Sequence, residues 1–451
     1  MPRAVLVITI DCLRADHVSA YGYPRDTTPT LDRLAESGVL WEQAHSTASW
    51  TKPSVTSMLT GLYPTQHGAF EGLKRNKGRL TVTTDTFNGK HPTLAERLSA
   101  GGWRCAAFIN NAQLGEFSGL QHGFDRYMPQ AGKADRLLEH FAQWLAEDDG
   151  RPVFAYLHFL EAHWPYKPRR RHVALFGGNR DTNYFRDHSA RDFGRLRRAI
   201  SRGGDELPDE QLQQMIQMYD GAVRRLDGKL KVLLNLLEQR GVREETALFV
   251  TADHGEEFLE HGKIGHGQAL YNELTHVPLI ASLPGGPVGR RISTPVSLVD
   301  LSDTVAHVAG IEQEDGAANL LDAPHTLSPV VSEIRIGRRY SQAIRVGDWR
   351  LHRRYTFERQ EDPDALRRRP HELLGSVPHT VRHELYHVGD DKDEQINLAD
   401  EPICREARER MIAEMDAWWS RAIAAIDDGP AREVEIDSTV VQRLRELGYV
   451  E

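Results

Sequence analysis

The chain has 451 residues, of which 40% are hydrophobic, and a formal net charge of −9. A chain of this length can bury a large core, and we expect it to divide into one large and one small domain. The acidic balance argues against a general nucleic-acid-binding protein. Its three cysteines are widely spaced and form neither a disulfide framework nor a zinc pattern, which favours a reducing compartment.

The first predicted element is a strand over residues 5–10 (VLVITI) that ends at Asp11. Its continuous apolar run is typical of a strand buried on both faces of a parallel sheet. Asp11 then lies at the carboxyl end of the strand, where open α/β sheets bind ligands, although an aspartate there can also cap the next helix. Because the chain enters this strand directly, and no apolar run reaches the length of a transmembrane helix, we expect a cytoplasmic protein that does not bind membranes.

Helices and strands alternate after this first strand. Residues 30–37 and 93–100 each predict a helix that stops at a glycine. Residues 153–159 (VFAYLHF) predict a further buried strand. The alternation indicates an α/β protein with a mostly parallel sheet.

An insertion over about residues 167–204 is rich in arginine. A charge run of this kind usually forms a solvated excursion, here partly helical. The alternative is a mobile lid that presents guanidinium groups to an anionic substrate. The arginines are Arg169, Arg170, Arg171, Arg180, Arg186, Arg191, Arg195, Arg197, Arg198 and Arg202.

Residues 211–239 predict a long helix that faces the core, because apolar residues recur at helical spacing. This helix leads to a predicted strand over residues 247–251 (ALFVT), which runs directly into ADHGE at 252–256. Asp253 and His254 are thus adjacent at a strand end. Both can ligate one cation if the turn directs them the same way.

The chain changes character near Pro324, so we predict a first domain over residues 1–325 and a second over residues 326–451. The charged segment 361–369 predicts an exposed loop. No heptad pattern or apolar stripe indicates an oligomeric state.

Several segments together resemble the sulfatase family of the alkaline-phosphatase superfamily. Residues 51–61 (TKPSVTSMLTG) resemble its nucleophile segment, residues 11–17 (DCLRADH) its metal-binding opening, and residues 252–256 its Asp-His-Gly-Glu signature. Residues 161–166 (EAHWPY) and 441–450 (VQRLRELGYV) are also similar, so the resemblance covers nearly the whole chain. It implies an alkaline-phosphatase-like fold, with a central, mostly parallel sheet flanked by helices and a smaller C-terminal α+β subdomain. Residues 341–351 resemble the hairpin of that subdomain, so the resemblance also implies an antiparallel hairpin there, followed by a further strand and a terminal helix.

Thr51 stands where sulfatases carry the cysteine or serine that becomes formylglycine. Threonine cannot follow that route because its β-carbon already carries a methyl group, so the hydroxyl itself is the expected nucleophile. In this respect the chain is similar to superfamily members with a threonine nucleophile, such as phosphodiesterases and phosphoglycerol transferases. The resemblance implies a divalent cation held by Asp11, Thr51, Asp253 and His254, while Cys12 replaces one further aspartate of the family opening. An imidazole ligand favours Mn²⁺ or Zn²⁺, with Ca²⁺ as an alternative.

The resemblance also implies residues around the substrate. His163 is expected to face it, either to protonate the leaving group or to neutralise charge, unless it is a hydrogen-bonded loop histidine. His266 aligns with a sulfate-binding lysine, and it could bind an oxyanion, or a second metal together with His163 and Glu161. Lys263 is a further candidate for an anion contact, although a lysine in a glycine-rich loop is more often solvated. Asn111 aligns with a family lysine and can hydrogen-bond an oxyanion.

Three functions are open at this point. The one we favour is a metal-dependent hydrolase or transferase of phosphodiester or phosphonate esters, with Thr51 as nucleophile and His163 and His266 as catalytic partners. The second is a sulfate-ester hydrolase without formylglycine, in which a sulfated threonine lacks the release route of a formylglycine hydrate. The third is a non-catalytic binding protein of the same fold. The expected partner is a small anionic ester.

Overall fold

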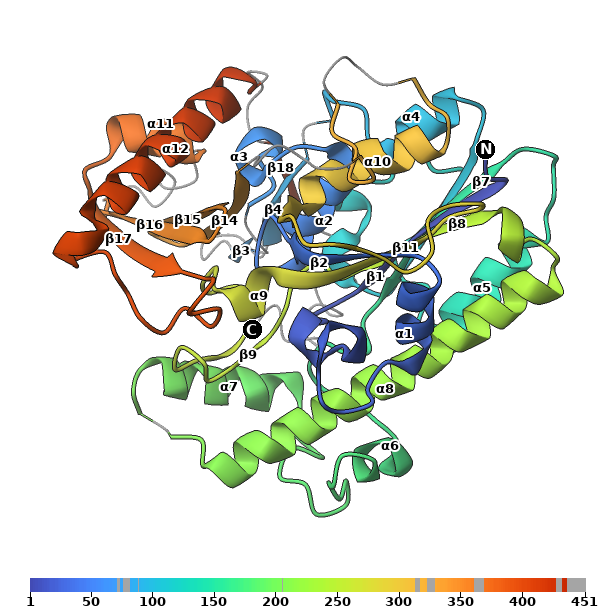
Figure 1. Cartoon of the computed structure of the whole chain (residues 1–451), viewed down its shortest axis with the longest axis horizontal. Helices are drawn as coiled ribbons and strands as arrows, with labels where there is room; N and C mark the ends of the chain where they lie inside the picture. Colours follow the sequence, from blue (N-terminus) through green and yellow to red (C-terminus); the bar gives the residue numbers. More distant parts are fainter. Residues whose placement is uncertain are drawn as a thin grey trace.

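The centre of the protein is a nine-stranded sheet, seen in a computed structural model (Figure 1). The structure describes residues 1–70, 74–75, 82–87, 89–204, 206–312, 317–322, 329–360, 369–426 and 432–435. In spatial order the strands are β12 (Arg290–Ile292), β2 (Val39–His45), β11 (His276–Ser282), β8 (Thr246–Thr251), β1 (Ala4–Ile10), β7 (Val153–Phe159), β5 (Arg104–Ile109) and β6 (Arg126–Met128), and β13 (Val296–Ser297) pairs with β2.

Most of these strands are parallel, as the sequence predicts. β1 runs parallel to β7 and β8, and β5 runs parallel to β7 and β6, whereas β11 is antiparallel to both of its neighbours. Every residue of β1, β7, β5 and β8 is buried, because helices cover both faces of the sheet. The register pairs Thr9 of β1 with His158 of β7 and Thr251 of β8, so these three strands end at the same edge.

Two groups of helices cover the faces of the sheet (Figure 1). One group is α1 (Pro29–Glu36), α5 (Ala134–Leu145) and the long α8 (Asp209–Gln239). The other is α2 (Thr51–Thr60), α4 (Leu94–Ala100) and α10 (Leu301–Val308), with the short α3 (Pro64–His67) after α2. The predicted core face of α8 is confirmed, since its apolar residues at helical spacing, among them Met215, Leu226, Leu230 and Leu237, are buried.

The arginine-rich insertion contains two helices, α6 (Arg170–Ala174) and α7 (Ala190–Ser201). α6 packs against α8, and α7 lies beside the small sheet of β9 (Glu257–Phe258) and β10 (Ile264–Gly265) (Figure 1). Phe193 of α7 stacks on Trp164, with ring centroids 4.4 Å apart and planes at 18°. The insertion is therefore partly helical, and one of its helices is fixed to the core by an aromatic contact.

A four-stranded antiparallel sheet forms the C-terminal part and contains the predicted hairpin. Its strands are β14 (Val330–Ile336), β15 (Arg339–Val346), β16 (Trp349–Phe357) and β17 (His379–His387), with α12 (Arg405–Ala424) packed on β16 and α11 (Pro370–Ser376) nearby. A third small sheet joins β18 (Arg432–Glu435), β4 (Val82–Thr86) and β3 (Lys74–Arg75). The predicted domain boundary at 325–326, the loop over 361–368 and the terminal helix near 441–450 lie outside the described residues.

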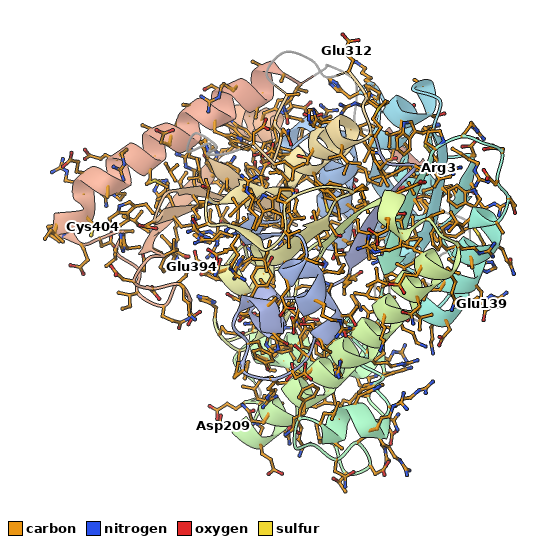
Figure 2. The ribbon with its side chains drawn as sticks, turned by 45° about the vertical axis from the view of Figure 1, so that its right-hand side comes forward. Arg3, Glu139, Asp209, Glu312, Glu394 and Cys404 are labelled. Atoms are coloured by element: carbon orange, nitrogen blue, oxygen red, sulfur yellow. The ribbon has the colours of Figure 1, made fainter. Side chains whose placement is uncertain are left out.

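Buried glutamates join the C-terminal sheet to the rest of the molecule. Glu394, labelled in Figure 2, accepts a hydrogen bond from the Asn272 backbone at 2.6 Å and contacts His352 Nε2 at 2.7 Å. Glu333 accepts hydrogen bonds from the backbone and the hydroxyl of Thr65 at 3.0 and 2.9 Å. These charge-assisted contacts fix the C-terminal sheet against α3 and α9 (Asn272–Thr275).

Within the described residues no helix has both the length and the apolar character needed to cross a bilayer.

Candidate active site

The candidate site lies at the carboxyl ends of β1 and β8. Asp11 directly follows β1, and Asp253 follows β8 with one residue between, so neighbouring parallel strands deliver two carboxylates to the same edge. Thr51 is the first residue of α2. Its Oγ1 lies 3.4 Å from Asp11 Oδ2 and 3.4 Å from His254 Nε2. All four predicted metal ligands are therefore brought together, and each is at most 2% exposed.

The spacing of these atoms fits a divalent cation. His254 Nε2 lies 3.7 Å from Asp11 Oδ1 and 3.5 Å from Asp253 Oδ2. Such separations are long for hydrogen bonds but suit ligand atoms that each stand about 2.1 Å from one ion. Asp253 Oδ2 is buried and has no hydrogen-bonding partner among the described residues. A buried carboxylate oxygen of this kind is costly unless a cation meets it.

The electrostatics of the cluster favour its charged forms. Burial alone would raise the pKa of Asp253, but the nearby imidazoles of His254 and His158 more than offset it and hold the pKa below the ordinary value. Burial would likewise lower the pKa of His254, and the carboxylates of Asp253 and Asp11 reverse this, so the pKa is raised. The two carboxylates thus concentrate negative charge at the strand ends, where a cation binds most favourably.

Asn111 and Cys12 complete the contacts around Asp11. Asn111 Nδ2 donates to Asp11 Oδ2 at 2.6 Å and to Thr51 Oγ1 at 3.2 Å. Asn111 therefore lies at Thr51, the predicted nucleophile, where its amide could also meet a substrate oxygen. The Cys12 thiol donates to Asp11 Oδ1 at 3.1 Å, and burial raises its pKa well above the usual value, so it stays neutral. Cys12 also has a left-handed backbone, with φ 61°, which is uncommon for a residue with a side chain.

Two predicted catalytic histidines stand beside the cluster. The ring of His266 lies 4.5 Å from that of His254 and 5.0 Å from that of His163. His266 Nδ1 contacts Glu256 Oε1 at 3.0 Å, and Glu256 Oε2 accepts from the Tyr166 hydroxyl at 3.1 Å. Burial lowers the pKa of His266 even though Glu256 opposes the shift. His163 Nδ1 contacts the carbonyl of Trp164, which fixes the orientation of its ring.

Lys263 and Glu161 are not brought to the cluster. The Lys263 backbone donates to Glu257 Oε1 at 3.0 Å. Burial lowers the pKa of its side chain, and the charges that act on that side chain are those of Glu257 and of β15, β16 and β17 residues. Glu161 Oε1 accepts from the backbone of Ala134 at 2.7 Å, at the first residue of α5. Among the described residues no contact joins either side chain to Thr51.

Three residues near the cluster have no role in the sequence predictions. Glu256 belongs to the Asp-His-Gly-Glu signature and orients His266. His158 lies on β7 with its Nε2 3.8 Å from Asp11 Oδ2 and 3.7 Å from Asp253 Oδ2. In the sequence, the feature that could have indicated His158 is a histidine inside an otherwise apolar central strand.

The third such residue is Arg197 of α7. A Cβ added to Gly265, the neighbour of His266, would lie 3.3 Å from Arg197 Cδ and 3.6 Å from Nη1. Burial lowers the pKa of Arg197, although the charges of Glu256 and Glu257 oppose this. No hydrogen bond or ion pair joins its guanidinium to another described residue. A guanidinium has five donors, so this one can still bind an anion.

This fold and this cluster define an α/β protein of the alkaline-phosphatase superfamily type, with candidate metal-binding residues at the carboxyl edge of its sheet. A sequence profile described as sulfatase matches residues 3–311. The chain belongs to the sulfatase family.

Curated relatives agree with this assignment. The chain is 26% identical to arylsulfatase A of Bos taurus over 341 residues, 69% of this chain and 65% of the relative. It is 30% identical to arylsulfatase K of Danio rerio over 128 residues, 28% of this chain and 23% of the relative. A multifunctional alkaline phosphatase superfamily protein of Trinickia caryophylli is 25% identical, covering 62% of this chain and 68% of that protein. The chain thus spans less than two thirds of the length of the two arylsulfatases.

Solved structures share the fold over nearly the whole chain. A protein solved with its substrate D-glucosamine-2-N,6-O-disulfate has a TM-score of 0.71 at 18% identity and covers 94% of this chain and 99% of its own. The phosphonate monoester hydrolase of Agrobacterium radiobacter has a TM-score of 0.70 at 18% identity and covers 94% and 96%. At these identities the likeness concerns the fold alone.

Proposed function

We propose that this protein is a metal-dependent hydrolase of small anionic esters, with the unmodified hydroxyl of Thr51 as nucleophile. The observation that carries the proposal is the position of Thr51 Oγ1, within 3.4 Å of both Asp11 Oδ2 and His254 Nε2. A bound divalent cation lowers the pKa of a neighbouring hydroxyl and neutralises charge on the ester. The imidazole of His254 as a ligand favours Mn²⁺ or Zn²⁺ over Ca²⁺. The free thiols of Cys12, Cys105 and Cys404 support a reducing, cytoplasmic location.

The chemistry follows from two displacements at phosphorus. In the first, Thr51 Oγ gives its proton to solvent and forms a bond to phosphorus, while the bond from phosphorus to the leaving-group oxygen breaks. His163 or His266 supplies the proton that the leaving oxygen needs. In the second, water, or an acceptor hydroxyl in a transferase, attacks phosphorus and releases Thr51. Asn111 Nδ2, 3.2 Å from Thr51 Oγ1, is positioned to donate to an oxygen of the reacting group.

Phosphodiesters and phosphonate esters are the substrates we favour. A threonine ester of phosphate can be hydrolysed by attack of water at phosphorus, whereas a sulfated threonine lacks the second hydroxyl that expels sulfate from a formylglycine hydrate. The fold shared with a phosphonate monoester hydrolase is consistent with this choice. Sulfate-ester hydrolysis is the second candidate, because several curated relatives are named as sulfatases.

Matched nitrophenyl esters test the proposal. We expect turnover of the phosphodiester or the phosphonate monoester to exceed that of the sulfate, and a chelator to abolish it. Mn²⁺, Zn²⁺ and Ca²⁺ added back singly identify the ion. Sulfate turnover above that of every phosphorus ester would instead support the second candidate. A protein that binds no divalent ion and cleaves no ester would be the non-catalytic binding protein.

Arg197 is proposed to bind additional negative charge on the substrate. Its guanidinium lies beside Gly265 without a partner among the described residues, and α7 is held in place by the stack of Phe193 on Trp164. Because Trp164 follows His163, this contact fixes the arginine on the side of the two catalytic histidines. A mostly buried guanidinium that has no protein carboxylate in hydrogen-bonding contact is well suited to an anionic group of the ligand.

Arg197→Ala is expected to raise KM about tenfold or more for an ester whose leaving group carries its own carboxylate. A hydrogen bond to a charged group is worth about 1.5–3 kcal/mol, which is the basis of this value. The matched control is Arg195→Ala, on the same helix but with a side chain 66% exposed, which we expect to change KM less than twofold. An ester with a neutral leaving group should respond to neither variant. Equal effects of both variants on both esters would contradict the assignment.

A further inference from the structure

His158 is a fully buried histidine whose ring has no hydrogen-bonding partner among the residues that the structure describes. It is 0% exposed, and neither Nδ1 nor Nε2 is within hydrogen-bonding distance of another described group. Its backbone is paired in the sheet, opposite Thr9 of β1 and Ile109 of β5. The ring is therefore fixed by a central strand.

The neutral and the protonated form of this imidazole each leave a buried N–H donor unpaired, which costs free energy. A neutral ring always carries one N–H, and a buried donor without an acceptor costs about 1–3 kcal/mol. A protonated ring would have carboxylate oxygens of Asp11 and Asp253 3.8 and 3.7 Å from Nε2, but its Nδ1–H would still have no acceptor among the described residues. A cation next to the ring would satisfy one of its two nitrogens, because the lone pair of Nε2 then becomes a ligand while Nδ1 carries the proton.

The surroundings of Nε2 fit such a cation. Asp11 Oδ2 lies 3.8 Å and Asp253 Oδ2 lies 3.7 Å from His158 Nε2, close to the 3.5–3.7 Å that separates His254 Nε2 from the same two carboxylates. Asp253 Oδ2 itself has no hydrogen-bonding partner in the described part of the chain. Asp11, His158 and Asp253 each offer one ligand atom, and these atoms all lie within 4.8 Å of one another.

We propose that His158 is a ligand of the divalent cation. The ligands then come from β1, from β7 and from the end of β8, and they include two imidazoles instead of one. The proposal rests on the metal-dependent function above and deepens it. The proposal also accounts for Cys12, which stands where the family opening has an aspartate. The Cys12 thiol donates to Asp11 and supplies no carboxylate, and His158 provides a ligand from the adjacent strand in place of that carboxylate. Two nitrogen ligands shift the preference of the site from Ca²⁺ towards Mn²⁺ or Zn²⁺.

Binding of Mn²⁺ to the full chain tests this directly. In protein with ¹⁵N-labelled histidine, pulsed EPR of bound Mn²⁺ should detect two coupled imidazole nitrogens in the wild type and one in His158→Gln. The Mn²⁺ affinity of His158→Gln, by titration calorimetry, should fall at least about tenfold, the size of a lost supporting ligand. Its Ca²⁺ affinity should change less than threefold, since the glutamine oxygen suits Ca²⁺.

Controls separate this result from misfolding and from failure of the proposed function. His45→Asn removes another imidazole that is 1% exposed at a strand end, and it should leave both the two couplings and the Mn²⁺ affinity unchanged. One coupling in the wild type, or two in His158→Gln, would overturn the role of His158 while the metal-dependent function stands. A wild type that binds no Mn²⁺, Zn²⁺ or Ca²⁺ would overturn the proposed function and, with it, the role of His158.

Discussion

Replacing Thr51 by alanine is expected to lower kcat for the preferred ester by at least about 10³-fold, because removal of a covalent nucleophile costs several orders of magnitude in comparable hydrolases. Thr51 Oγ1 lies 3.2 Å from Asn111 Nδ2 and 3.4 Å from Asp11 Oδ2, and alanine leaves no oxygen at that point. Steady-state turnover with saturating metal measures the effect. Thr51→Ser keeps the hydroxyl and should keep a measurable part of the rate.

A second buried threonine of the same helix provides the control for folding. Thr56 Oγ1 donates to the Lys52 carbonyl at 2.7 Å, within α2 and away from the cluster, so Thr56→Ala should lower stability slightly and keep the rate. Acid quenching during turnover should trap a modified peptide containing Thr51 in the wild type and none in Thr51→Ala. If Thr51→Ala kept more than a tenth of the wild-type rate, the threonine could not be the nucleophile.

The strand-end part of the site was predictable from local sequence. Asp11 and Asp253 each follow a run of buried apolar residues, and parallel neighbours in one sheet end at one edge. The strand end also indicated His254, and the family resemblance added Thr51, whose Oγ1 the structure places 3.4 Å from His254 Nε2. The same local patterns predicted the mostly parallel sheet and the long α8, because each depends on periodicity within a single segment, whereas the C-terminal hairpin was predicted from the family resemblance.

Residues whose roles depend on tertiary packing could not be found in this way. His158 lies in a strand that reads as uniformly buried, and its meaning depends on Asp11 and Asp253, which come from other strands. Arg197 is one of ten arginines in the insertion, and the charge run does not indicate which of them faces the site. That selection is made by Phe193, which stacks on Trp164. Lys263 shows the reverse case, since the charges that act on its side chain are those of Glu257 and of residues in the C-terminal sheet.

Divalent metal should stabilise the protein, and Asp253→Asn should remove most of that effect. A ligand that binds only the folded state at about 1,000 times its Kd contributes about 4 kcal/mol. We therefore expect the wild-type Tm to rise by several degrees when Mn²⁺ is added to chelated protein. Asp253→Asn keeps the shape of the side chain but removes a charge from the cluster, so its Mn²⁺ affinity should fall at least about 100-fold and its Tm should respond little.

The size of this loss reflects the position of Asp253 in the cluster. Its Oδ2 lies 3.5 Å from His254 Nε2 and 3.7 Å from His158 Nε2. Its Oδ1 accepts a weak hydrogen bond from the Cys12 backbone at 3.4 Å. One carboxylate therefore contacts three of the groups that define the site. Asp220, equally buried but paired with His17 and Arg25, is the matched control. Asp220→Asn should lower the Tm of the chelated and the loaded protein alike, because it breaks a buried ion pair, while the rise caused by Mn²⁺ persists. Identical melting of chelated and Mn²⁺-treated wild type, together with unchanged ester turnover, would show that the cluster acts without a metal.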